Sequence, residues 1–171
     1  MPGKYLGIFY PEIRNPKSEI RNQTMGVKMK ILVAIDGSKD AGKGAELALD
    51  IAKTQGAEVW LLAVIPVYPG IDLEITARAR DSLHNKLSSQ AELDLGKAKD
   101  FFQAEGIIPK AMLVGSGAIA DEIVTMAEQE KMDLIVIGSR GLGATGRFSL
   151  GGTAMKIIGQ APCSVLVAKS N

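Results

Sequence analysis

The 171-residue sequence has little of several residue types, and each shortage excludes a class of protein. Its one cysteine, Cys163, cannot form an intrachain disulfide or the thiolate cluster of a structural zinc site. Aromatic residues make up only 5% of the chain, which argues against a stacking platform for single-stranded nucleic acid. The formal net charge is +1, so no overall field attracts nucleic acid or an anionic membrane. We therefore expect neither among the partners of this protein.

Long apolar runs and targeting signals are also missing. No apolar run reaches the roughly 18 residues that a membrane-spanning helix needs. Residues 1–28 show no sustained hydrophobic period, and a proline interrupts the apolar patch where a signal peptide would have its core. We therefore expect a cytoplasmic protein in which residues 1–28 are a disordered or extension arm outside the folded domain.

What the chain does contain, over residues 29–170, is an alternation of two hydrophobic patterns. Continuous apolar runs predict strands at 30–35, 57–65, 110–115, 132–138 and 164–169. Between them, apolar residues recur at helical spacing, such as Leu83, Leu95 and Phe102 in a long helix that ends at Gly106. This alternation predicts a single α/β domain, with a doubly wound five-stranded parallel sheet and helices on both faces.

Two glycine-rich segments each imitate a phosphate-binding motif. Residues 37–44, GSKDAGKG, match a P-loop except at the last position, where Gly44 has no hydroxyl to bind magnesium. Residues 141–146, GLGATG, have the spacing of a dinucleotide-binding turn. That turn should follow the first strand and precede an acidic residue by about twenty positions. Here it follows the fourth strand, and no acidic residue occurs after Asp133, so the dinucleotide-binding turn is rejected. The P-loop is rejected because Gly44 lacks the hydroxyl.

The strand ends and the glycines still favour an anion site. Ligands in open α/β sheets lie beyond the carboxyl ends of strands, and the first and fourth strands lead into residues 36–38 and 138–141. If these strands are neighbours, their ends form one crevice. Gly151 and Gly152 begin the last predicted helix, where backbone amides without side chains attract anions. Arg140 could also reach a phosphate; the alternative is that the glycines serve only tight turns and close packing.

Two stretches of the chain resemble one known family. Residues 138–169 resemble the C-terminal third of the universal stress protein (UspA-type) family, and KILVAIDGS at 30–38 resembles its first strand and aspartate turn. The similarity covers about residues 29–170. It implies a Rossmann-like fold of the adenine nucleotide alpha hydrolase type with strand order 3-2-1-4-5, in which the first and fourth strands are neighbours. It also implies a homodimer joined through residues 164–169, an apolar edge strand that would otherwise be uncovered.

The ATP-binding branch of this family carries the pattern G-x2-G-x9-G-[ST]. Gly138, Gly141 and Gly151 match its glycines, whereas Gly152 stands in the Ser/Thr position and Thr153 follows it. A lost hydrogen bond to a charged group costs roughly 1.5–3 kcal/mol, enough to weaken ATP binding without abolishing it. Two interpretations stay open: a member that binds ATP or a related adenine nucleotide, which we favour, and a member that binds none.

The resemblance also implies roles for single residues. Asp36 and the Gly138 amide would hold the ribose, and the backbone at Val64 would read the adenine edge. The amides of Gly141 and of residues 151–154 would hold the phosphates. The candidate cofactor-binding residues are Ala34, Ile35, Asp36, Ser38, Val64, Gly138, Arg140, Gly141, Gly151, Gly152, Thr153 and Ala154.

We therefore predict a stress-related regulatory homodimer that binds an adenine nucleotide, with at most slow hydrolysis. The alternative is a stress or interaction protein of the same fold that binds no nucleotide. An enzyme is not expected, because the sequence shows no nucleophile–base pair and no cluster of metal ligands. The one histidine, His84, is expected on the surface of the long helix. Asp36 could hold a magnesium ion beside the phosphates, although ribose contact or capping of the first helix is favoured.

Overall fold

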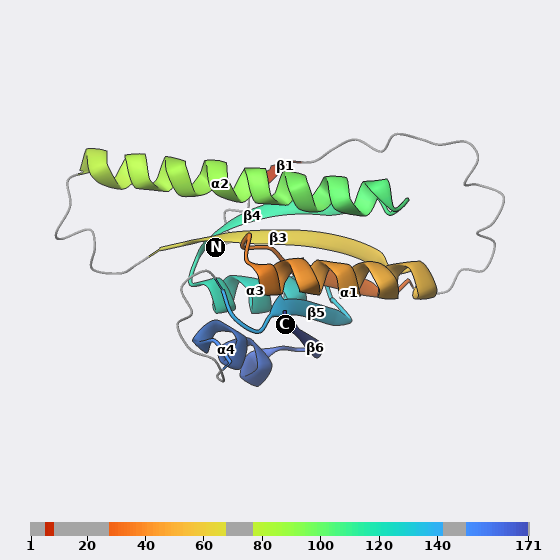
Figure 1. Cartoon of the computed structure of the whole chain (residues 1–171). Helices are drawn as coiled ribbons and strands as arrows, with labels where there is room; N and C mark the ends of the chain where they lie inside the picture. Colours follow the sequence, from red (N-terminus) through yellow and green to blue (C-terminus); the bar gives the residue numbers. More distant parts are fainter. Residues whose placement is uncertain (1–5, 9–27, 68–76, 142–149, 171) are drawn as a thin grey trace.

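The computed structural model describes residues 6–8, 28–67, 77–141 and 150–170, which form a six-stranded sheet covered by helices (Figure 1). The strands are β1 (Leu6–Ile8), β2 (Lys30–Ala34), β3 (Glu58–Pro66), β4 (Ala111–Gly117), β5 (Leu134–Gly138) and β6 (Ser164–Ala168). Their order across the sheet is β1-β4-β3-β2-β5-β6. Strands β2 to β6 run parallel, so the predicted order 3-2-1-4-5 is confirmed and β2 lies beside β5.

Helices cover both faces of the sheet, as the alternating pattern predicts. They are α1 (Lys39–Gln55), α2 (Ala77–Ala104), α3 (Ile119–Gln129) and α4 (Gly152–Gln160). Helices α1 and α2 pack on one face, around a core that includes Ala48 and Phe102. Helices α3 and α4 pack on the opposite face, around a core that includes Ile123 and Ile157. This arrangement confirms the doubly wound α/β fold.

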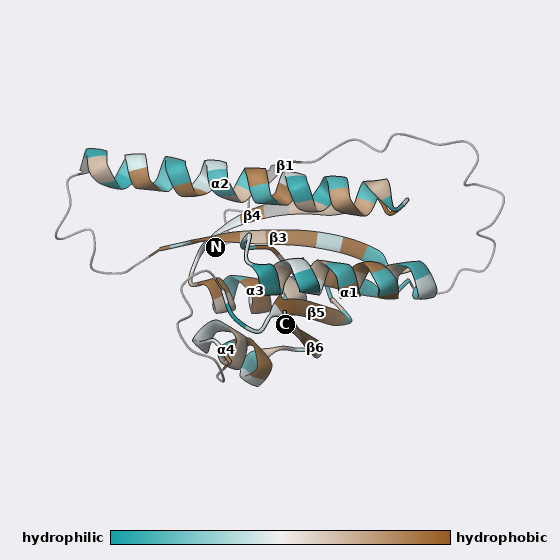
Figure 2. Cartoon of the chain, in the orientation of Figure 1, coloured by the Kyte–Doolittle hydropathy of each residue, from teal (hydrophilic) through white to brown (hydrophobic). Residues whose placement is uncertain are grey.

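The continuous apolar runs reflect strands that are buried on both faces. In β2, Ile31, Leu32 and Val33 are fully buried. Ile31 and Val33 belong to the α1/α2 core, whereas Leu32 belongs to the α3/α4 core. Successive side chains of a strand point to opposite faces, so a strand with two covered faces needs an apolar residue at every position. Figure 2 shows the same concentration of hydrophobic residues along β3 and β5.

The long helix α2 is buried only in its second half. Leu95 and Phe102 are buried as predicted, whereas Leu83, which has the same helical spacing, is 43% exposed. The reason is geometric, because the first turns of α2 extend beyond the sheet (Figure 1), where the described residues offer no layer to pack against. His84 is exposed on this part of the helix, as expected.

Residues 6–8 form a strand that the sequence pattern did not predict. Leu6 and Ile8 pair with Val114 and Met112, antiparallel to the rest of the sheet. The expectation that residues 1–28 lie outside the fold is therefore wrong for this segment, while residues 1–5 and 9–27 fall outside the described residues. A segment of 3 residues is too short to show a hydrophobic period, so the pattern could not reveal it.

No helix in the described part of the chain is both long and apolar enough to cross a bilayer.

Candidate functional site

A cavity of about 550 Å³ lies beyond the carboxyl ends of the neighbouring strands β2 and β5, where the crevice was expected. The candidate residues that line it are Ala34, Ile35, Asp36, Val64, Gly138, Arg140, Gly141, Gly151, Gly152, Thr153 and Ala154. Ser38 is the one candidate that does not line the cavity. The fold therefore brings together residues from both ends of the domain sequence.

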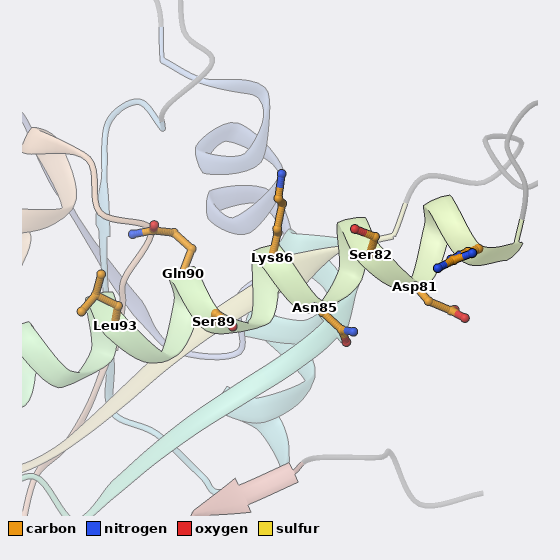
Figure 3. A pocket seen from close by; sticks show the side chains of 8 residues that line it. Asp81, Ser82, Asn85, Lys86, Ser89, Gln90 and Leu93 are labelled. Atoms are coloured by element: carbon orange, nitrogen blue, oxygen red, sulfur yellow. The ribbon is translucent and has the colours of Figure 1, made fainter.

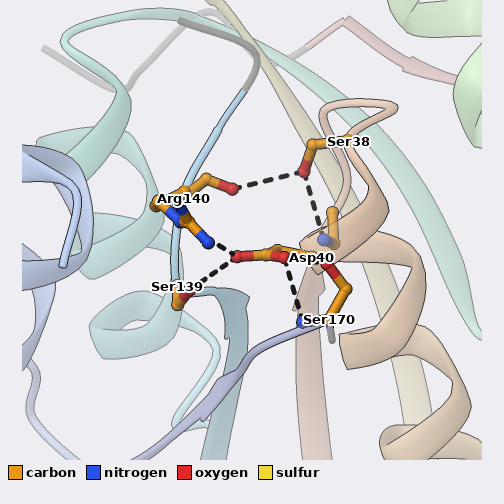
Figure 4. Close-up of polar contacts among 6 residues, drawn as sticks. Ser38, Asp40, Ser139, Arg140 and Ser170 are labelled. Atoms are coloured by element: carbon orange, nitrogen blue, oxygen red, sulfur yellow. Dashed lines mark hydrogen bonds and ion pairs between the residues drawn. The ribbon is translucent and has the colours of Figure 1, made fainter. Parts of the chain in front are cut away.

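The exit of β2 is a tight turn built around Asp36. Its Oδ1 accepts a hydrogen bond from the Ser38 amide at 2.9 Å, and Gly37 adopts a φ of 76°, a conformation that favours glycine. Ser38 then caps α1, because its Oγ accepts from the Ala41 amide at 3.1 Å. The same hydroxyl donates to the Arg140 carbonyl at 3.4 Å (Figure 4). Ser38 therefore joins the exits of β2 and β5 instead of facing the cavity.

The glycines around the cavity meet different requirements. A Cβ on Gly138 would lie 2.8 Å from the Ala41 nitrogen, so α1 can pack against the end of β5 only if position 138 has no side chain. A Cβ on Gly141 would lie 2.8 Å from Asp36 Oδ2, which places this carboxylate close against the glycine loop. A Cβ on Gly152 has no described atom within 4 Å. Packing therefore explains Gly138 and Gly141, whereas Gly152 faces open space at the cavity wall.

The start of α4 presents backbone amides to the cavity. The N-cap of this helix is Gly151, no described side chain caps its first turn, and the first turn contains no acidic residue. The Gly151 amide itself donates to the Ser139 carbonyl at 2.8 Å. The amides that follow lack a partner within the helix, as in the first turn of any α-helix. Because residues 151–154 line the cavity, these amides and the helix dipole favour an anion there.

Two polar residues of α2 also line the cavity, and the sequence analysis missed both. Gln90 Nε2 donates to Asp94 Oδ2 at 2.9 Å, and Lys97 Nζ lies 3.1 Å from Asp94 Oδ1. Asp94 is buried against the turn after β2, since a Cβ on Gly37 would lie 2.6 Å from its Oδ2. The available signal was a pair of polar residues, four positions apart, that directly precede Ala91 and Leu95 of the apolar stripe of α2.

Asp40, in the first turn of α1, is a second residue that the sequence analysis did not single out, and it is only 5% exposed. Its Oδ2 accepts from Ser139 Oγ at 2.5 Å, and its Oδ1 accepts from the amide of Ser170 at 3.0 Å and from the Ser170 hydroxyl (Figure 4). Arg140 Nε lies 3.9 Å from Oδ2. The hydrogen bonds from Ser139 and Ser170, with a smaller effect of the Arg140 charge, outweigh burial and lower the pKa of Asp40 from 3.8 to about 2. Asp40 is therefore an ionised carboxylate at neutral pH that links α1 to the segments after β5 and β6.

A second depression, of about 660 Å³, runs along α2 (Figure 3). Its described lining residues are Arg78, Asp81, Ser82, Asn85, Lys86, Ser89, Gln90 and Leu93. All of them belong to α2, and all are exposed. Because a ligand site needs groups that converge from several directions, this one-sided surface is not a candidate on the described residues.

Comparisons with known proteins agree with the motifs at the site. Residues 29–169 match the universal stress protein family. A universal stress protein of Methanocaldococcus jannaschii is 36% identical over 141 residues, which cover 82% of this chain and 81% of that relative. The universal stress protein UspA from Lactobacillus plantarum matches in structure with a TM-score of 0.68 at 24% identity, over 84% of this chain and 99% of that one.

Some solved structures with the same fold contain adenine nucleotides. The universal stress protein from Archaeoglobus fulgidus in complex with dAMP matches with a TM-score of 0.58 at 21% identity, over 84% of this chain and 100% of that one. Others are a universal stress protein in complex with cAMP and a family member from Arabidopsis thaliana with AMP bound. The family match includes both stretches that carried the resemblance, the aspartate turn after β2 and the glycine-rich exit of β5, and the chain therefore belongs to the universal stress protein family.

Proposed function

We propose that the cavity binds ATP or a related adenine nucleotide. The observation that carries this proposal is the convergence of three kinds of wall on one cavity. Asp36 offers a carboxylate to hydroxyl groups, Val64 and Leu87 contribute apolar surface for a flat base, and the start of α4 offers amides to phosphates. A nucleotide carries all three groups in one molecule, and a volume of about 550 Å³ is within the usual range for cofactor pockets.

The proposed contacts follow the chemistry of each wall. Asp36 and the Gly138 amide would hold the ribose, and the backbone at Val64 would contact the adenine edge. The phosphates would lie against the amides of Gly141 and of residues 151–154, with Arg140 beside them. Asp36, a carboxylate of the cavity wall, could also ligate a magnesium ion that accompanies the phosphates. The described residues contain no group of three or more His, Cys, Asp or Glu that could hold a metal by itself.

Gly152 is the position at which the family pattern has a hydroxyl. The space around its Cβ position is open, so the fold itself does not require glycine there. Thr153, the next residue, also lines the cavity and would supply a hydroxyl one position later. The proposal therefore predicts measurable but weakened ATP binding.

The relatives support the choice of nucleotide, because solved members of the fold hold dAMP, cAMP or AMP. We propose a regulatory protein with at most slow hydrolysis, since the described lining residues do not pair a nucleophile with a general base. The second candidate is a member of the family that binds no nucleotide, and Gly152 in the Ser/Thr position is the observation that favours it.

The test is to identify the bound ligand directly. The purified protein is denatured, and the supernatant is chromatographed for adenine nucleotides, while a stripped sample is titrated calorimetrically with Mg-ATP. We expect a nucleotide in the supernatant or a saturable heat of ATP binding. If neither is observed, the proposal is wrong and the second candidate replaces it.

We also propose that the protein acts in the cytoplasm as a dimer joined through β6. This strand lies at one edge of the sheet, and an uncovered apolar edge strand is a template for pairing with another chain. The neighbouring helix α4 exposes Met155 by 62% and Ile158 by 48%, which extends the apolar surface beside the strand. Analytical ultracentrifugation should give twice the chain mass for the wild type and a shift toward monomer for Met155→Glu. A monomeric wild type at micromolar concentration would rule out the dimer.

A further inference from the structure

The contacts of Asp40 lie behind the cavity. Asp40, Ser139 and Ser170 are not among the residues that line it. Ser139 is nevertheless followed directly by Arg140 and Gly141, which do line it. Any influence of Asp40 on a ligand therefore acts through the position of neighbouring groups.

Ser139 joins three parts of the fold through three different groups. Its amide donates to the Ala168 carbonyl at 2.6 Å, its carbonyl accepts from the Gly151 amide at 2.8 Å, and its hydroxyl donates to Asp40. Ala168 is the last residue of β6, and Gly151 is the N-cap of α4. A shift of Ser139 would therefore move the exit of β5 and the start of α4 together. These are the two walls proposed to hold the phosphates.

The other oxygen of Asp40 holds the chain just beyond β6. The Ser170 amide and hydroxyl both donate to Oδ1, while the Ser139 hydroxyl donates to Oδ2. An ionised carboxylate accepts at both oxygens, which suits donors on two sides. An asparagine at position 40 would turn an NH₂ group toward one of these donors, so at least one side of the bridge would be lost.

We infer that Asp40 is a positioning residue that couples the edge strand β6 to the ligand cavity. By holding Ser139 and Ser170 on its two oxygens, it makes the spacing between the β5 exit and α4 depend on the position of β6. The inference rests on the proposed function only for its effect on nucleotide affinity, because the positioning itself needs no ligand. The coupling is reciprocal: a ligand that fixes the cavity walls also stabilises the end of β6, and a contact made by β6 changes the affinity.

The first measurement is amide hydrogen exchange without nucleotide, for Asp40→Asn and for the matched control Asp50→Asn. Asp50 is exposed on the same helix and does not line the cavity, so the control makes the same chemical change away from the bridge. In Asp40→Asn we expect exchange to become at least about tenfold faster in residues 138–141 and 164–170. We expect no change in β3 of this variant and none anywhere in the control.

The second measurement tests the coupling with Mg-ATP. In the wild type, saturating ATP should slow exchange in residues 164–170, although the described cavity wall includes none of them. In Asp40→Asn this protection should be lost, and the dissociation constant for ATP should rise about tenfold. In Asp50→Asn both should match the wild type.

The outcomes separate the inference from the proposed function. If exchange in Asp40→Asn rises equally in β3, Asp40 only stabilises the fold and the inference is wrong. It is equally wrong if ATP binds the wild type without protecting residues 164–170. If the wild type binds no ATP but Asp40→Asn still loosens both segments, the proposed function fails and the positioning stands. If Asp40→Asn does not fold, Ser170→Ala is the alternative variant, because it removes only one hydroxyl donor. It should speed exchange in residues 164–170 alone and reduce ATP affinity about threefold. Unchanged exchange and affinity in Ser170→Ala would also overturn the inference.

Discussion

Two polar regions border the end of β5, and they are built in opposite ways. Behind the strand, Asp40 is buried and its carboxylate is hydrogen-bonded to Ser139 and Ser170. On the cavity side, the first turn of α4 has no described capping side chain and Gly152 faces open space. In the described part of the chain, no buried side-chain nitrogen or oxygen lacks a hydrogen-bond partner. The hydrogen-bonded groups around Asp40 therefore stabilise the fold, whereas the backbone amides at the start of α4 are accessible to a ligand.

The largest effect on ATP affinity should come from adding a carboxylate at the start of α4. Gly152→Asp places a negative charge at the start of α4, where it interacts favourably with the helix dipole and repels phosphates. Because juxtaposed like charges cost several kcal/mol, ATP affinity should fall at least about a hundredfold, while thermal stability stays the same or rises. Isothermal calorimetry and thermal unfolding measure the two effects separately.

Gly159→Asp is the matched control for this charge. Gly159 lies near the other end of the same helix, and a Cβ there also meets no described atom within 4 Å. ATP affinity should be unaffected by this variant. If both variants bind ATP as tightly as the wild type does, the phosphates do not lie at the start of α4.

The packing of α1 against the end of β5 should instead be sensitive to added side-chain volume. Gly138→Ala places a methyl group 2.8 Å from the Ala41 nitrogen and 3.0 Å from Asp40 Cβ, so α1 must shift. Overpacking of this kind typically costs about 1–3 kcal/mol of unfolding free energy. Gly96→Ala in α2, where a Cβ meets nothing within 4 Å, should instead raise stability by about 0.5–1 kcal/mol. Urea titrations that gave both variants the same sign would contradict the packing explanation for Gly138.

Acid should lower the unfolding free energy by protonating Asp40. Because the folded state lowers the pKa of Asp40 from 3.8 to about 2, its contribution is fully present above pH 3.8 and declines as the pH falls toward 2. At pH 7 the wild type should exceed Asp40→Asn by on the order of 2 kcal/mol in unfolding free energy. The difference should shrink below pH 4 and be lost only below about pH 2, where Asp40 is protonated in both states. A difference that stays constant from about pH 6 down to about pH 3 would show that ionisation of Asp40 is not its source.

The smallest effect should come from restoring the family hydroxyl. Gly152→Ser has room for its side chain and could donate a hydrogen bond to a phosphate. ATP affinity should rise about three- to tenfold, whereas Gly152→Ala, which adds a methyl group without a donor, should give no gain. Equal affinities for the serine and alanine variants would show that Thr153 or the backbone already supplies this contact.

Most of the fold could be predicted because its strands are buried on both faces. A run such as that of Ile31, Leu32 and Val33 is recognisable without any knowledge of its partner strands. The strand order was implied by the resemblance to the family, and the structure confirms it. Strand β1 escaped prediction because its pairing depends on the edge of β4 and not on a period of its own.

The candidate site was predictable to the extent that it lies at strand ends. Asp36 and the glycines follow directly after β2 and β5, and the structure places them around one cavity. Asp40, Ser139 and Ser170 could not be connected from the sequence, because they are separated by 99 and 130 positions and only the fold brings them into contact. The need for glycine at 138 likewise arises from the approach of α1, which no local pattern encodes.

The short strand β1 limits how many molecules can join through their sheets. Its 3 residues cover Met112 to Val114 on the β4 side and are too few to serve as a template for another strand. The β6 side is then the one long edge that the described sheet offers for pairing. Two copies that meet there around a two-fold axis use up each other's remaining edge. As far as the described sheet is concerned, growth by strand addition would then end at two subunits, because neither of its outer edges would remain free for a third copy.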